Sequence, residues 1–161
     1  MSDGKNADHF NGKWAIVTVD DRLPPLAEQI ARARAFGVRE STYGRHDISA
    51  LLIDDVTSVK RTTNWTKHLP MRAKLIEAGI IWELKGDQVW FCTPLCVGFS
   101  EKHARETVEG LWAGGMEVYV HTLRNNGPAC YAPGDDLTTL LEMVAYEQNA
   151  AAVRLSRARK S

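Results

Sequence analysis

The run Trp14-Ala-Ile-Val-Thr-Val19 decides the fold of this chain. Its residues are nearly all apolar and several are β-branched, which is typical of a strand buried on both faces. A similar run, Ala50-Leu-Leu-Ile-Asp54, follows after a helical segment at 26–36 that begins behind two prolines and ends at Gly37. Strands that alternate with helices predict an α/β fold, a three-layer sandwich with a mostly parallel sheet and helices on both faces.

Further elements continue this alternation along the chain. We expect a short strand at 38–43, a helix at 65–78 stopped by Gly79, a hairpin of strands at 80–84 and 88–92, a helix at 100–112, a strand at 116–121, an irregular loop at 125–134 and a helix at 136–160. These elements predict three segments, which are a polar leader at 1–12, an α/β domain at 13–135 and a long C-terminal amphipathic helix at 136–161.

Composition narrows the class of protein. Of the 161 residues, 44% are hydrophobic and 25% are charged, which is the profile of a folded domain rather than of disorder. Twenty basic and twenty acidic residues cancel, so any attraction to nucleic acid must be local. The chain has neither a bilayer-length apolar run nor a secretion signal, and these features predict a cytoplasmic location without membrane contact. No glycine-rich phosphate loop follows a strand, so no small-molecule substrate is indicated.

Acidic pairs follow both buried strands, at Asp20-Asp21 and at Asp54-Asp55. The carboxyl ends of parallel strands share one edge of the sheet, where four carboxylates could gather and bind Mg²⁺. Aspartates also cap helices and start turns at such positions. We favour the capping interpretation, and Mg²⁺ stays as the alternative for a receiver-like signalling domain.

The cysteines predict no disulfide framework and no resident metal. Cys92, Cys96 and Cys130 are an odd number in a chain large enough to fold without disulfides, so we expect reduced thiols. Cys92 and Cys96 with His103 and His121 have a spacing unlike that of a zinc finger. We therefore predict no metal site and no cofactor.

The C-terminal helix carries an apolar stripe at helical spacing, at positions 137, 140, 141, 144, 151, 152 and 155. Its length of roughly 37 Å, at about 1.5 Å per residue, exceeds the width of a small domain. We expect this stripe to form a dimer interface made of Leu140, Leu141, Val144, Gln148, Ala151 and Leu155.

The same helix ends in a basic run. Its cations are Arg154, Arg157, Arg159 and Lys160, and no acidic residue follows Glu147. Positive charge at a helix C-terminus complements the helix dipole, and it also suits contact with phosphate. The residues alone leave these two interpretations equally open.

Together these pieces resemble the N-terminal catalytic domain of the serine recombinases, the resolvase/invertase family. That family begins with a strand reading Tyr-x-Arg-Val-Ser and then a helix that carries a Gln. Here Ile16-Val-Thr-Val-Asp20 and Gln29 occupy these places. The resemblance puts Asp20 at the position of the nucleophilic serine and Thr18 at the position of the first active-site arginine.

The family's second signature, Asp-Arg-Leu-x-Arg followed by a helix and a glycine, has two possible placements. Leu52–Arg61 keeps an apolar residue and the second arginine, Arg61, but has Thr57 and Ser58 where Asp and Arg are expected. Pro94–Ser100 keeps a glycine and a serine but has no arginine. In the first placement, residues 85–115 are an inserted β–α piece.

The last segment is similar to the long helix that ends this catalytic domain, carries its dimer contact and runs to DNA, and Glu147-Gln148 stands at the family's usual Glu-Arg. Phosphoryl transfer to a serine needs a hydroxyl nucleophile and clustered arginines, which are missing here. The resemblance therefore implies a catalytically inactive protein, not an enzyme in DNA recombination, that is a homodimer and is DNA-associated or regulatory. A receiver-like metal-binding domain and a pure protein-interaction module are the alternatives.

Overall fold

The computed structural model describes residues 12–39, 49–57, 59, 68–122 and 127–160, with side chains up to 158. In chain order the elements are β1 (Lys13–Val19), α2 (Leu26–Phe36), β2 (Leu51–Asp55), α3 (Pro70–Trp82), β3 (Gln88–Phe91), α4 (Pro94–Val97), α5 (Glu101–Ala113), β4 (Glu117–His121), β5 (Pro128–Tyr131) and α6 (Thr138–Lys160). Helices separate the strands from β1 to β4, which confirms an α/β fold.

The strands form one five-stranded sheet in the order β2-β1-β3-β4-β5. The pairs β1–β2, β1–β3 and β3–β4 are parallel, and β5 runs antiparallel to β4. The predicted run at 14–19 lies inside β1, one of the inner strands, with Thr18 opposite Asp54 of β2. The carboxyl ends of β1, β2 and β3 therefore share one edge of the sheet, named here the carboxyl edge.

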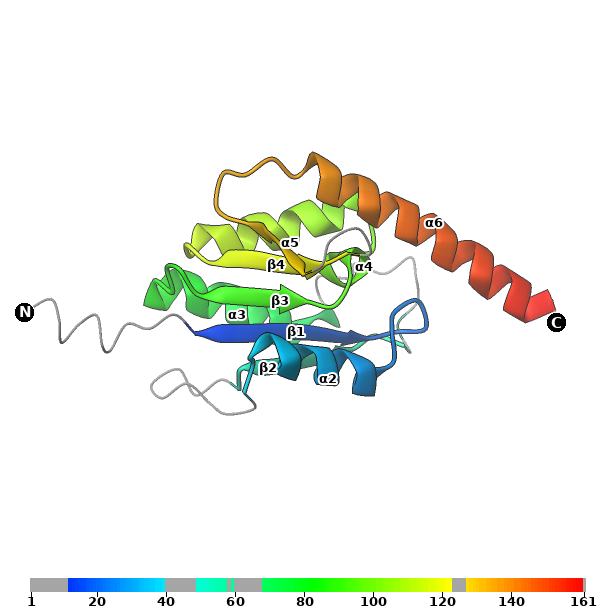
Figure 1. Cartoon of the computed structure of the whole chain (residues 1–161), viewed down its shortest axis with the longest axis horizontal. Coiled ribbons are helices and arrows are strands. Elements are labelled where there is room, and N and C mark those ends of the chain that lie inside the picture. The colour runs from blue at the N-terminus through cyan, green and yellow to red at the C-terminus, as the bar shows by residue number, and fades with distance from the viewer. Residues whose placement is uncertain (1–11, 40–48, 58, 60–67, 123–126, 161) are drawn as a thin grey trace, which may run out of the picture.

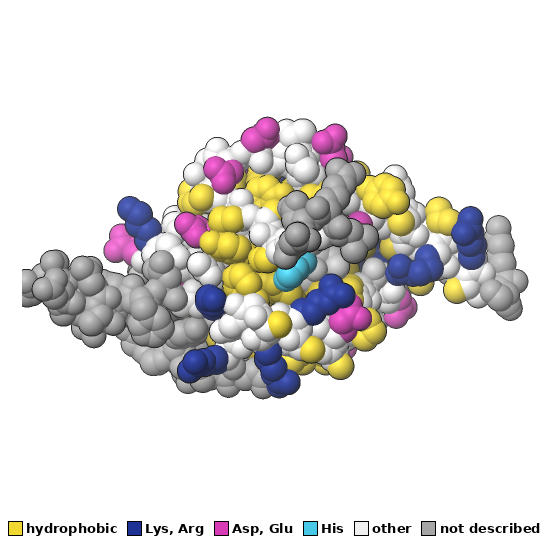
Figure 2. Space-filling model, in the orientation of Figure 1, with side chains coloured by type: hydrophobic (Ala, Val, Ile, Leu, Met, Phe, Trp, Pro, Cys, Tyr) yellow, Lys and Arg dark blue, Asp and Glu magenta, His cyan; other side chains and the backbone are white. Residues whose placement is uncertain are grey.

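Helices lie on both faces of the sheet (Figure 1). On one face α2 packs on β1 and β3, where the Phe36 and Trp90 rings stack with centroids 6.5 Å apart. On the other face α3 packs on β2, and α5 packs on β4. Figure 2 shows hydrophobic side chains gathered above α2, on the part of the first face next to that helix. Helix α6 packs against α4 and α5 and then projects past the sheet (Figure 1).

The predicted hairpin at 80–84 and 88–92 is wrong. Helix α3 runs through Gly79 to Trp82 and ends at Glu83, whose φ of 51° is left-handed. Gly79 serves packing instead of termination, because its backbone lies against Gly114 at the end of α5. Strand β3 therefore pairs with β1 and β4, and residues 85–115 are not an insertion but contain a central strand.

One further prediction is wrong, and another is tested at only two of its residues. Residues 128–131, expected to be an irregular loop, form the edge strand β5. Its first residue is a proline, which is tolerated there because an edge strand does not need every backbone N–H to donate to a neighbour. Val38 and Arg39 are not in a strand, and the rest of the segment predicted at 38–43 lies outside the described residues. The final helix begins at Thr138, behind Asp136, whose Oδ1 accepts the backbone N–H of Thr138 at 2.9 Å.

Candidate functional site

The end of β1 is tied to helix α2 by one buried amide. The Nε2 group of Gln29 donates to the backbone oxygens of Thr18 and Pro24, both at 2.8 Å, and its Oε1 accepts the Thr18 N–H at 3.4 Å. Both side chains are fully buried. The structure thus brings together two residues that the sequence placed at degenerate active-site positions, and the visible role of Gln29 is to hold the strand to the helix.

Asp20, at the position of the nucleophile, is held by an ion pair. Its Oδ1 lies 2.7 Å from Nε of Arg22, and its Oδ2 accepts from Nη2 at 3.2 Å. The Arg22 guanidinium also lies 4.0 Å from the centre of the Phe99 ring, an arrangement that adds a cation–π attraction. The carboxylate is therefore engaged within its own loop.

A buried arginine that sequence reasoning missed lies beneath Thr18. Arg72, on the first turn of α3, is 4% exposed. Its Nη1 donates to the Val97 carbonyl at 2.6 Å and to Thr107 Oγ1 at 3.1 Å. Its Nη2 donates to the Cys96 carbonyl at 2.7 Å and to Thr18 Oγ1 at 3.2 Å. Burial lowers the pKa of Arg72 to about 10, and nearby Asp54 opposes that shift.

The acidic pairs do not gather into a metal site. Asp54 accepts the backbone N–H groups of Met71 and Arg72 through its two oxygens, each at 3.0 Å, and so satisfies the N-terminus of α3. Asp55 accepts the backbone N–H of Thr57 at 3.0 Å. Within the described ranges no three His, Cys, Asp or Glu side chains are placed to hold a metal ion. The capping interpretation is confirmed for Asp54.

The cysteines and histidines that were considered for a zinc site make separate local contacts instead. Burial raises the pKa of the Cys96 thiol to about 12, and burial also raises the pKa of Cys92. Both thiols therefore stay protonated at neutral pH. His103 accepts the Phe99 N–H through Nδ1 at 3.2 Å, and His121 packs edge-on against Trp90 with ring centroids 5.7 Å apart.

The buried His103 makes stability depend on pH. Burial, helped by Arg72 and Arg22, lowers its pKa from 6.5 to about 4. The folded chain then binds the proton less tightly than the unfolded chain, so the stability conferred by neutral His103 is complete above pH 6.5 and is lost as pH falls toward 4. We expect the free energy of unfolding to fall by about 2 kcal/mol from pH 7 to pH 5 through this group.

Urea denaturation at several pH values measures this slope. The control is His103→Asn, whose side-chain oxygen can accept the Phe99 N–H without titrating. A variant slope equal to that of the wild type between pH 7 and pH 5 would contradict the assignment.

Glu147 joins α6 to the carboxyl edge. Its Oε1 accepts the Leu95 N–H at the start of α4 at 3.1 Å, and burial raises the pKa of its carboxyl group. The resemblance placed Glu147 at the family's usual Glu, and the contact shows that this position faces the loop behind β3. Gln148, its neighbour, is exposed.

The apolar stripe of α6, the predicted dimer seam, is mostly buried within the same chain. Leu140 and Val144 are fully buried, and Leu141 and Ala151 are 7% and 2% exposed. They pack against α4 and α5, because the helix closes the domain before it projects. Of the other two residues, Gln148 is exposed and Leu155 is half-buried. A dimer contact through the four buried residues would require unpacking the domain.

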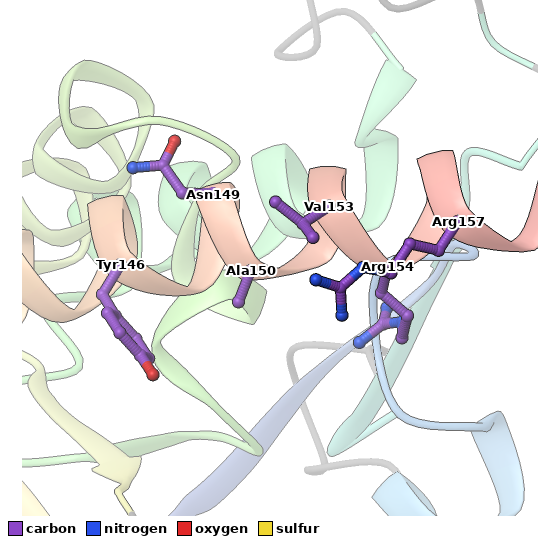
Figure 3. Close-up of a pocket in the computed structure, with 6 residues that line it drawn as sticks. All are labelled: Tyr146, Asn149, Ala150, Val153, Arg154 and Arg157. Carbon is purple, nitrogen blue, oxygen red and sulfur yellow. The ribbon is translucent and has the colours of Figure 1, made fainter.

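The opposite face of α6 is open (Figure 3). A groove of about 480 Å³ along it is lined by Tyr146, Asn149, Ala150, Val153, Arg154 and Arg157. These positions recur at three- and four-residue intervals, so they share one helix face. Tyr146 is 75% exposed and Val153 is 49% exposed. We name these six residues the outer face of α6.

The basic end of α6 begins on this outer face. Arg154 and Arg157 are exposed, and Arg154 Nη2 donates to the backbone oxygen of Asp21 at 3.3 Å. This bond orients Arg154 toward the loop behind β1, at the carboxyl edge. Arg159 and Lys160 belong to the last turn of α6, and their side chains, like the predicted Arg61, lie outside the described residues.

Comparison with protein-family models, with curated proteins and with solved structures gives no match to this chain. In the described residues, no helix is both long enough and apolar enough to cross a bilayer.

Proposed function

We propose that this chain is a catalytically inactive, recombinase-like protein that associates with the DNA backbone through the projecting end of α6. The observation that carries the proposal is this helix, whose last turns pass beyond the sheet with basic side chains exposed (Figures 1 and 2). Phosphate contacts by Lys and Arg are the main source of sequence-independent affinity for DNA.

The topology supports the resemblance on which this proposal rests. A mostly parallel sheet with helices on both faces and a long C-terminal helix is the arrangement that the resemblance implied. The placement of the second signature on Pro94–Ser100 gains support, because this segment follows β3, forms the short helix α4 and then reaches Gly98. Strands β2 and β3 both pair with β1, so either placement brings the two signatures together at the carboxyl edge.

The contacts at that edge support the loss of catalysis. Asp20 is paired with Arg22 and cannot replace a serine hydroxyl as the nucleophile in phosphoryl transfer. Arg72 is the arginine that reaches Thr18, but its guanidinium is buried and its Nη groups are used on carbonyl and hydroxyl oxygens. Such a group cannot hold a phosphate from solvent.

Reversing the charge at Arg154 and Arg157 tests DNA binding. We expect Arg154→Glu/Arg157→Glu to weaken binding of a labelled duplex by at least ~10-fold at low salt, and to reduce the slope of log affinity against log salt by roughly two. Fluorescence anisotropy across a salt series measures both quantities.

The matched control is Lys74→Glu/Lys85→Glu, which makes the same change in net charge at exposed positions on α3 and just behind it. This control is expected to bind as the wild type does, apart from a general electrostatic loss. Equal weakening by both variants, or no binding by the wild type at low salt, would contradict a role for α6.

A second copy of the chain is the proposed partner for the outer face of α6. Ala150 is small enough at its centre for two helix backbones to approach closely, and it is flanked by the exposed Tyr146 and Val153.

Sedimentation velocity tests this dimer. We expect Ala150→Glu to shift the chain to monomer at concentrations where the wild type is dimeric, because it buries an unpaired charge at the contact. Ala152→Glu is the control, since Ala152 is also exposed but lies off the outer face. A monomeric wild type would remove the dimer, and a dimer without DNA binding would favour the protein-interaction alternative.

A further inference from the structure

A groove lies between helices α3 and α5, which run side by side in the same direction. Arg72 of α3 is bonded to Thr107 of α5, and Gly79 faces Gly114 about two turns further along both helices. The groove encloses about 350 Å³, within the range of small-molecule sites, ~300–1,000 Å³. Its lining residues come from α3, from the N-cap residue Leu69 and from α5.

The walls of this groove are largely apolar. Leu69 is buried, Ile76 is half-buried and Ile80 is 51% exposed, so the apolar surface runs from the core to solvent. Ala73 is exposed on the same helix face, because positions 69, 73, 76 and 80 recur at three- and four-residue intervals. An alkyl chain laid along this strip would remove apolar surface from water, which is favourable.

Two carboxylates line the same groove, one from each helix. Glu77 of α3 and Glu106 of α5 are both exposed. In the described part of the chain neither carboxylate has an ion-pair or hydrogen-bond partner, whereas Glu109 on the same helix as Glu106 pairs with Arg105. Two unpaired carboxylates beside one apolar strip attract a cation and repel an anion.

The basic groups at the inner end of the groove do not offset this negative charge. Arg72 is 4% exposed, its Nη groups are bonded inside the protein, and Asp54 lies nearby as a counter-charge. His103 is neutral at pH 7, because burial lowers its pKa to about 4. A ligand in the groove therefore meets apolar side chains along the walls and negative charge at the rim.

We propose that the α3–α5 groove binds a small organic cation that consists of an ammonium group on an apolar tail. The ammonium lies at the rim between Glu77 and Glu106, and the tail lies along Ala73, Ile76 and Ile80. The site takes no residue from α6, so it does not depend on the DNA contact proposed for that helix.

Titration of the full chain with decylammonium, below its critical micelle concentration, tests the proposal. Isothermal calorimetry gives the affinity, and the methyl resonances of Ile76 and Ile80 report whether the tail reaches the groove. Decanol and decanoate have the same tail without the positive charge. We expect decanol to bind at least ~3-fold more weakly and decanoate at least ~10-fold more weakly than decylammonium.

Glu77→Gln/Glu106→Gln removes both rim charges and keeps the size of the side chains. We expect it to weaken binding of decylammonium by at least ~3-fold and to leave binding of decanol unchanged. The matched control, Glu109→Gln/Glu142→Gln, removes two exposed carboxylates outside the lining and is expected to bind decylammonium as the wild type does.

Ala73→Phe fills the groove from an exposed helix position and is expected to abolish binding of decylammonium with the fold intact. Ala152→Phe adds the same side chain at an exposed position on α6 and is expected to bind as the wild type does. No binding of decylammonium, equal binding of the three probes, equal affinity of the two glutamine variants, unmoved Ile76 and Ile80 resonances or binding that survives Ala73→Phe would each overturn the site.

Discussion

Replacing Arg72 with methionine is expected to lower the free energy of unfolding by about 3–5 kcal/mol. The side chain holds four acceptors from three separate segments, which are β1, the α4 turn and helix α5. Methionine fills a similar volume but donates no hydrogen bond. The buried carbonyls of Val97 and Cys96 would then lose this hydrogen-bond donor, and water does not reach them to replace it.

Urea denaturation followed by tryptophan fluorescence measures this loss. Arg105→Met is the control, because Arg105 is half-exposed on α5 and its ion pair with Glu109, at 3.8 Å, is an i, i+4 surface pair. We expect that control to cost less than about 0.5 kcal/mol. A loss below about 1 kcal/mol for Arg72→Met would show that these bonds contribute little beyond the packing of the stem.

The parallel part of the fold could be predicted because its signal is local. The apolar run at 14–19 has the length and composition of a buried strand, and the helix at 26–36 has proline before it and glycine after it. Strand β5 carries no such signal, because its four residues include a proline and the strand is only partly buried. Its pairing with β4 depends on tertiary contact that no local pattern records.

For the candidate site, the sequence predicted where some of the residues lie but not the contacts that they make. The sequence placed Thr18 and Asp20 at the end of one strand and Gln29 on the helix that follows, where the structure also has them, with Gln29 bonded to Thr18. It did not indicate Arg72, because a lone arginine in a helix usually lies on the surface. The available signal was spacing, since Arg72 lies three residues from both Leu69 and Leu75, and these neighbours are buried.

The C-terminal helix shows a different limit of sequence patterns. Its apolar stripe was correctly located. Helical spacing, however, predicts only that one face of the helix is buried and does not predict which segment or partner buries it. Leu140 and Val144 are covered by the chain's own α4 and α5. The outer face, with Tyr146 and Val153 among polar residues, has the weaker pattern and yet is the face open to a partner.

Gly114→Ala is expected to lower the free energy of unfolding by about 2–4 kcal/mol. The reason is steric, because a β-carbon at Gly114 would lie 2.5 Å from the backbone carbon and oxygen of Gly79. Backbone atoms of α3 cannot rotate away as a side chain can, so the two helices would have to separate. The conformation of Gly114, φ −89° and ψ 0°, is open to alanine, so strain of the substituted residue itself contributes little.

Gly110→Ala, in the same helix, isolates that steric effect. Its β-carbon would meet only the Ile76 side chain, at 3.2 Å, and alanine favours a helix interior by roughly 1 kcal/mol over glycine. We expect this control to unfold within about 1 kcal/mol of the wild type. If Gly114→Ala were as stable as Gly110→Ala in urea, the close approach of α3 and α5 would not exist in solution.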